Sequence, residues 1–174
     1  MERYTRPAIA LHWLTGALII AAFALGLTMV DIPGLTPTKL KYFSWHKWIG
    51  VTVLGLACVR VLWRLTHPAP SYPVSMAAWQ QKAAHGLHGL LYVLIFAIPV
   101  SGYFYSLAAG VPVVYLGVLP LPVLIDADPA LKPILKQVHY AFNMVLLAAV
   151  AGHLLAALKH QFIDKDGVLA RMLP

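Results

Sequence analysis

Charged residues are scarce in this sequence of 174 residues, and acidic residues are the scarcest. Only 11% of the residues are charged, and six Asp and Glu stand against thirteen Lys and Arg. A typical soluble domain has about 25% charged residues, so the composition excludes an ordinary soluble globule. Apolar residues make up 60% of the chain, and the mean hydropathy is +0.76, which predicts an integral membrane protein.

Cysteine is nearly absent as well. The single cysteine, Cys58, lies within an apolar run, so the chain has neither a disulfide framework nor the Cys-x-x-Cys-His motif of covalent haem attachment. The net charge of +7 does not indicate a nucleic-acid partner, because the basic residues flank the apolar runs instead of forming one stripe. We expect them to face membrane lipid.

Four apolar segments are long enough to cross a bilayer, which takes about 20 residues each. They cover residues 8–29, 45–63, 85–105 and 136–159. The first segment is too long for the apolar core of a secretory signal, so we expect it to be retained. The sequence therefore predicts an all-α integral membrane protein, a single domain over residues 1–174 that forms a four-transmembrane-helix bundle.

The connection over residues 106–133 is unusual because it is apolar and rich in proline. Pro112, Pro120 and Pro122 remove backbone donors and break helices, so a fifth span is excluded. We expect an interfacial loop or a short helix that lies over the bundle.

Basic residues near the span ends predict the orientation. With the amino terminus inside, eight basic residues lie inside and five lie outside. The inside set is Arg3, Arg6, Arg60, Arg64, Lys82, Lys159, Lys165 and Arg171, and the outside set is Lys39, Lys41, Lys47, Lys132 and Lys136. Both termini are therefore expected in the cytoplasm.

Histidines carry the chemistry of this sequence, because ionisable side chains are costly within a membrane and usually mark a function. His139 and His153 are 14 residues apart, about 40° short of four whole turns, so they share one helix face about 21 Å apart. This spacing suits two stacked cofactors. Each cofactor then needs a second ligand at the same depth on another helix.

Depth selects the partners. His46 is the one spanning histidine at the outer level of His139, so these two form the outer pair. Several histidines lie at the inner level, namely His12, His85, His88, His153 and His160, and the depths of His12 and His153 agree best. Two imidazoles on one haem iron fill both axial positions, which favours electron transfer over oxygen chemistry. Small residues at Gly16, Gly50, Gly55, Gly102 and Gly152 leave room for a flat macrocycle.

Several short runs resemble the bacterial cytochrome b561 family over nearly the whole chain. They are Ile9 to Leu14, His46 with Gly50, Val59 to Leu65, Ala84 to His88, Lys136 to His139, and the stretch from His153 and His160 to Arg171 and Met172. The resemblance implies a four-helix protein of the bacterial inner membrane with two b haems. It also implies that the axial ligands of the haem iron are His12, His46, His139 and His153.

The same resemblance implies ubiquinone as a redox partner and an inner quinone site near His88 and His160, in a family that includes a superoxide oxidase. In one family member the loop after the second helix is rich in lysine, whereas residues 65–81 of this chain contain none. Alternatively, His85 and His88 face interfacial water or form hydrogen bonds with haem propionates. His160 lies at a helix end, where the helix dipole favours a cation. Arg60 and Arg64 neutralise haem propionates or reach the inner surface.

We therefore predict a dihaem b-type cytochrome, an oxidoreductase that passes electrons between a periplasmic donor such as superoxide and the quinone pool. The outer lysines would attract such a small anion. One alternative is a haem-carrying anchor subunit of a dehydrogenase or hydrogenase, with a protein redox partner. A further alternative is a metal or proton transporter that uses the histidines as its path.

Overall fold

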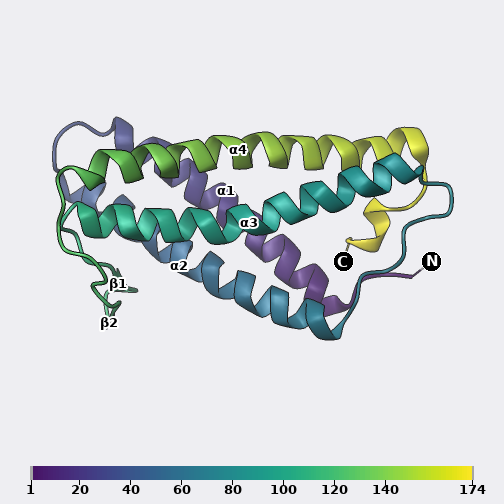
Figure 1. Ribbon diagram of the computed structural model, residues 1–174, viewed down its shortest axis with the longest axis horizontal. Helices are drawn as coiled ribbons and strands as arrows, with labels where there is room; N and C mark the ends of the chain where they lie inside the picture. The colour runs from purple at the N-terminus through teal and green to yellow at the C-terminus, as the bar shows by residue number, and fades with distance from the viewer. Residues whose placement is uncertain (1, 174) are drawn as a thin grey trace.

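Four long helices run side by side in the computed structural model, which describes residues 2–173 (Figure 1). They are α1 (Arg6–Asp31), α2 (Pro37–Thr66), α3 (Ala78–Ala108) and α4 (Leu131–Lys159). Pro37 opens α2 at a position where its missing N–H costs nothing, and the Thr36 hydroxyl accepts a bond from the Lys39 N–H at 3.2 Å. Each helix is long and apolar enough to cross a membrane, so the predicted four-helix membrane bundle is confirmed.

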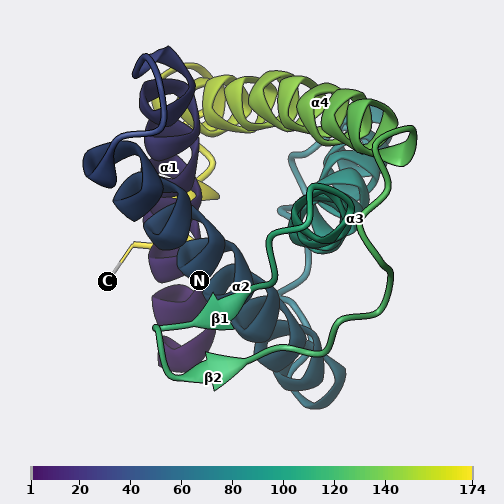
Figure 2. The same ribbon diagram turned by 90° about the vertical axis from the view of Figure 1, so that its left-hand side faces the viewer.

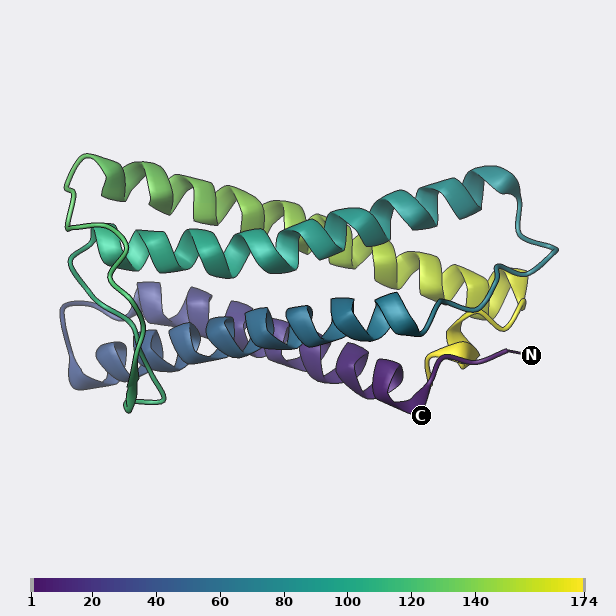
Figure 3. The ribbon, with the colours of Figure 1, turned by 60° about the horizontal axis from the view of Figure 1, so that its bottom comes forward.

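The helices pack as two antiparallel pairs, α1 with α2 and α3 with α4, and α2 also contacts α3 (Figures 2 and 3). The buried apolar core is small and centres on Leu94 of α3 with Leu146 and Ala149 of α4. Large apolar side chains such as Ile20 and Leu155 are instead well exposed on the outside of the bundle. This distribution is typical of a protein whose outer surface contacts lipid tails.

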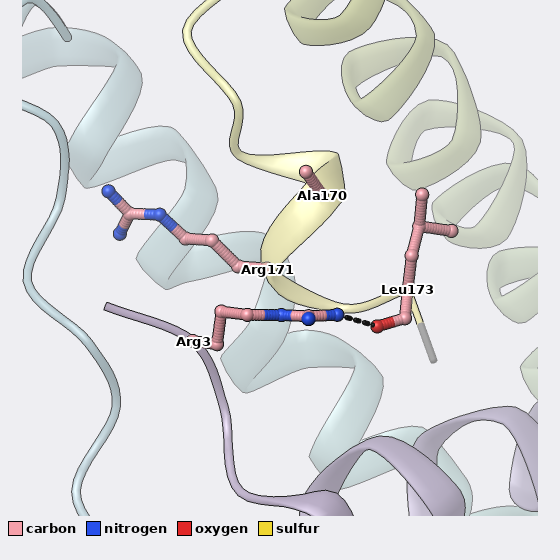
Figure 4. A pocket seen from close by; sticks show the side chains of 4 residues that line it. All are labelled: Arg3, Ala170, Arg171 and Leu173. Atoms are coloured by element: carbon pink, nitrogen blue, oxygen red, sulfur yellow. Dashed lines mark hydrogen bonds between the residues drawn. The ribbon is translucent and has the colours of Figure 1, made fainter. Parts of the chain in front are cut away.

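Both chain ends lie at the same end of the bundle, which we call the inner end; the opposite end is the outer end (Figure 1). After α4 the chain forms a π-helical turn, η1 (His160–Asp164), and a short 3-10 helix, η2 (Leu169–Arg171). This segment returns to α1, where the Trp13 indole N–H donates to the Met172 carbonyl at 2.7 Å. A pocket beside it is lined by Arg3, Ala170, Arg171 and Leu173 (Figure 4).

The connection between α3 and α4 differs from the expected loop or short helix over the bundle. It contains a two-stranded antiparallel hairpin, β1 (Val114–Tyr115) and β2 (Leu119–Pro120), which lies beside α2 (Figure 2). The Trp48 indole N–H donates to the Val114 carbonyl at 2.7 Å and thereby ties the hairpin to α2. Leu116 and Gly117 have positive φ angles of 52° and 76°, which a tight hairpin turn needs.

Candidate haem-binding sites

The outer end holds one pair of facing histidines, His46 at the outer end of α2 and His139 on α4. Their ring centroids are 6.3 Å apart and the rings are inclined at 84°. Metal–imidazole bonds are about 2 Å long, so two imidazoles on one metal ion have ring centres roughly 6 Å apart. The separation of the two rings therefore fits one metal ion between them.

Backbone carbonyls fix which nitrogen of each outer ring is free. His46 Nδ1 lies 2.8 Å from the Ala22 carbonyl oxygen on α1, and His139 Nδ1 lies 3.1 Å from the Ile98 carbonyl oxygen on α3. The Ser101 hydroxyl is a further partner of His139 Nδ1 at 3.0 Å. A carbonyl only accepts, so each Nδ1 carries the proton and each Nε2 keeps its lone pair. Metal-binding histidines usually show this arrangement.

A glycine lies against each outer ring, one helical turn beyond the carbonyl that holds it. A Cβ atom at Gly26 on α1 would come within 3.3 Å of His46 Cε1, and one at Gly102 on α3 within 2.9 Å of His139 Cε1. Real Cβ atoms essentially never come as close as 2.9 Å. Glycine at both positions therefore gives the imidazole access to a carbonyl that a larger residue would cover.

The inner end holds three histidines instead of two. The His153 ring on α4 lies 6.0 Å from the His12 ring on α1 and 5.4 Å from the His88 ring on α3, measured between centroids. The structure thus brings together the expected pair, His12 and His153, and adds His88 as a second neighbour of His153.

Arg60 of α2 completes this inner group. One terminal guanidinium nitrogen of Arg60 lies 3.3 Å from His12 Nδ1, and its Nε–H donates to the Tyr92 hydroxyl at 3.1 Å. A guanidinium only donates, so Nδ1 of His12 accepts in this arrangement. No Asp or Glu side chain pairs with Arg60 among residues 2–173. A positive charge in this setting suits an anionic group such as a carboxylate.

Open space lies beside one histidine at each end of the bundle. Gly16 follows His12 by one turn and Gly50 follows His46 by one turn, and a Cβ atom at either glycine would meet nothing within 4 Å. A flat macrocycle held by either histidine would have room over the neighbouring turn of the helix. Together with the free Nε2 atoms of the outer pair and the ring separations at both ends, this space means that the residues present fit haem.

The two histidines that were expected at a quinone site, His88 and His160, have different neighbours. His88 contacts His153, whereas His160 contacts Asp164 and Asp166 at the end of α4. The structure therefore does not bring His88 and His160 into contact with each other.

One of the outer lysines, Lys47, turns into the bundle. It is half-buried and its Nζ donates to the buried Ser106 hydroxyl at 3.4 Å. Lys39 instead donates to the Ile32 carbonyl, and Lys41 lies over the Trp45 ring.

Comparison with known proteins identifies the family. The family model described as prokaryotic cytochrome b561 matches residues 3–174. The chain belongs to the cytochrome b561 family. Cytochrome b561 homolog 2 of Escherichia coli (strain K12) is 37% identical over 174 residues, which cover 99% of this chain and 92% of that protein. The probable superoxide oxidase CybB of Yersinia pestis is 28% identical over 177 residues, which cover 99% of this chain and 97% of that protein.

Membership of the family settles the general function. The protein is a multi-pass bacterial membrane cytochrome of the b type that takes part in electron transfer. Haem b is its cofactor, lipid is its environment, and it exchanges electrons with redox partners.

Sequence reasoning missed the residues that orient the outer rings. Ala22 and Ile98 act through their carbonyls, which any residue has, so side-chain identity carries no signal. Gly26 was not among the glycines expected to matter, although Gly102 was. The signal in the sequence was a glycine near the outer end of α1 and of α3, each opposite a histidine on the helix that follows it in the chain.

Proposed function

We propose that this cytochrome binds two b haems and transfers electrons between a periplasmic donor, such as superoxide, and ubiquinone. His46 and His139 would be the axial ligands at the outer end, and His12 and His153 those at the inner end. The chain, residues 1–174, would act as one functional unit in the bacterial inner membrane, with both termini in the cytoplasm. The observation that carries the proposal is the outer pair, whose rings lie 6.3 Å apart with both Nδ1 atoms bonded to carbonyls.

At the inner end, His153 is the common member of both histidine contacts. We assign His12 as its partner because their 6.0 Å separation is nearer to the value of roughly 6 Å for two imidazoles on one metal. Gly16, one turn from His12, also has open space beside it. His88, at 5.4 Å from His153, is then left for a role next to the haem.

The protein would hold each haem from both faces through imidazoles and keep it out of water. Bound haem supplies a ferric and ferrous couple for one-electron transfer, and the ligands, burial and nearby charge set its potential. Arg60 would pair with a propionate carboxylate of the inner haem, because its guanidinium has no acidic partner among the described side chains.

Superoxide suits the outer end because it is a small anion. Five lysines lie near this end, namely Lys39, Lys41, Lys47, Lys132 and Lys136, and their summed field raises the encounter rate of an anion. Lys47 is the inward-turned member of this group, next in sequence to the haem ligand His46. One relative of the chain is named a probable superoxide oxidase.

Ubiquinone would be reduced at the inner end, where His88 lies against His153 and His160 lies at the end of α4. Quinone reduction consumes protons as well as electrons, and imidazole is suited to proton transfer near neutral pH. These two histidines are therefore the residues proposed to contact the quinone or to supply its protons.

Optical spectra of the purified protein, oxidised and reduced by dithionite, test the proposal when haem is counted per chain. Two low-spin b haems per chain are expected, with reduction by superoxide that slows as salt screens the lysines. Reoxidation by ubiquinone should need no other protein. A strict requirement for a copurified dehydrogenase would favour the anchor-subunit alternative, and full haem content in His153→Ala would contradict the inner pairing.

A further inference from the structure

A histidine and two carboxylates meet where α4 ends at the inner surface. His160 Nδ1 lies 2.7 Å from Oδ2 of Asp166 and 3.2 Å from Oδ2 of Asp164. The side chain of His160 is 12% exposed, that of Asp166 6%, and that of Asp164 27%. The shorter contact is thus also the more buried one.

Asp164 and Asp166 bind different partners. Asp164 receives the Lys159 ammonium at 2.5 Å and 2.8 Å through its two oxygens. Asp166 faces His160 with Oδ2, while its Oδ1 accepts the Val168 N–H at 3.1 Å. Because Lys159 already neutralises Asp164, no uncompensated pair of carboxylates remains to attract a cation. Asp166 is the carboxylate committed to His160.

His160 is also aligned with the inner histidine group. It follows His153 by seven residues along α4, which is about 20° short of two whole turns and a rise of about 10 Å. His160 therefore lies on the same helix face as His153, between the inner histidines and the aqueous surface. A proton that moves from the inner surface toward His153 along this face would meet His160 first.

We propose that Asp166 is the positioning residue for proton delivery to the quinone. It accepts the Nδ1–H of His160, which fixes the ring and leaves Nε2 as the nitrogen that can exchange a proton. This inference rests on the proposed function, because it assumes that quinone is reduced near His160. A carboxylate on Nδ1 also stabilises the imidazolium form, which is the form that can donate a proton.

The conversion of a quinone to a quinol takes two protons and two electrons, and the same proton transfer from His160 occurs twice. The Nε2–H bond of the His160 imidazolium breaks, and an O–H bond forms on a quinone oxygen that receives one electron from the donor. The neutral imidazole keeps its Nδ1–H toward Asp166. A hydronium ion at the inner surface then returns a proton to Nε2 and leaves a water molecule.

Asp166→Asn in the haem-loaded protein tests this role. The protein is first reduced with one equivalent of dithionite per haem and then mixed with ubiquinone-1, and haem reoxidation is followed in H₂O and in D₂O. The asparagine oxygen can still accept the Val168 N–H, but the neutral amide no longer stabilises the imidazolium. We expect a loss of about tenfold or more at saturating quinone, a larger solvent isotope effect, an unchanged half-saturating quinone concentration and an unchanged haem spectrum.

Two further variants are the matched controls. Asp166→Glu keeps the carboxylate and should recover part of the rate, and Asp164→Asn should stay within about threefold of the parent protein because Asp164 serves Lys159. Equal losses in the Asp164 and Asp166 variants would overturn the inference, as would a parent-like rate and isotope effect in Asp166→Asn. If Asp166→Asn does not fold, full activity in His160→Gln would overturn it instead.

If the proposed function itself is wrong, the experiment gives a result that differs from all those of the Asp166 variants. In that case the haem-loaded parent protein itself would not be reoxidised by ubiquinone-1, and the inference would fall with it.

Discussion

The two ends of the bundle hold their histidines in different ways. At the outer end, main-chain carbonyls of α1 and α3 hold His46 and His139, and glycines make room for the rings. At the inner end, the His153 ring contacts both His12 and His88, and Arg60 contacts His12, so these histidines are held by other side chains. Helical carbonyls cannot change partners without breaking the helix, whereas side chains can. The outer site is therefore fixed by the fold, and the inner site can adapt to what it binds.

The largest effects should come from removing single histidines. His139→Ala should lower the haem content from two per chain to about one, because His46 would then have no second histidine at its level. The inner comparison is His12→Ala against His88→Ala. We expect His12→Ala to lose the inner haem and His88→Ala to keep it, as measured by the pyridine haemochromogen assay. The reverse order would show that His88 is the inner ligand.

The glycines of the outer site give the next largest effect. In Gly102→Ala the new Cβ would lie 2.9 Å from His139 Cε1, and forcing an atom into a packed site costs about 1–3 kcal/mol. Outer haem should therefore bind about tenfold or more weakly, as measured by haem titration of the apoprotein. Gly26→Ala is the milder partner, because its contact with His46 is 3.3 Å. Equal affinities in both variants and the parent protein would contradict the role of close contact.

Arg60 tests the inner end. Arg60→Gln keeps a donor but removes a positive charge that opposes the ferric state of a nearby haem. The midpoint potential of the inner haem should fall by on the order of 60 mV, equal to a tenfold change in a one-electron equilibrium. Potentiometric titration followed by absorbance measures the shift. The outer haem should keep its potential, and equal shifts at both haems would contradict the assignment of Arg60 to the inner one.

Ser101 should give the smallest change. In Ser101→Ala, His139 Nδ1 loses its hydroxyl partner but keeps the Ile98 carbonyl. A single hydrogen bond contributes about 1 kcal/mol net, and a weaker acceptor makes the imidazole a poorer ligand for ferric iron. The outer midpoint potential should therefore rise by about 20–40 mV, with full haem content. A fall in potential would mean that the hydroxyl donates to the ring.

The sequence was sufficient to predict the helices and to predict that His46 lies opposite His139. Four apolar runs and the spacing of His139 and His153 follow from the rise and turn of a helix, and His46 was the only candidate at its depth. The inner end was harder because several histidines lie near one level, so the choice of His12 over His88 rested on a small difference in depth. The structure brings both rings to His153. The haem ligands at both ends of the bundle remain a prediction.

The hairpin between α3 and α4 shows a second limit. Its prolines excluded a fifth span, but nothing in their pattern indicated where the segment would pack. Its position depends on two distant side chains of α2, Trp48 at the Val114 carbonyl and Thr52 at the Tyr115 hydroxyl. Such contacts join residues more than sixty positions apart, and local propensity does not encode them.

The carbonyl and glycine that hold each outer ring form a unit that a protein designer could transplant. Its parts are a carbonyl at one position of a helix, a glycine four positions later, and a histidine on the antiparallel neighbour. At His46 the Ala22 carbonyl orients the ring without a polar side chain, so this form of the unit adds nothing to the cost of membrane insertion beyond the histidine itself. A synthetic bundle that repeats the unit about every four turns, the spacing of His139 and His153, would arrange haems in a row about 21 Å apart.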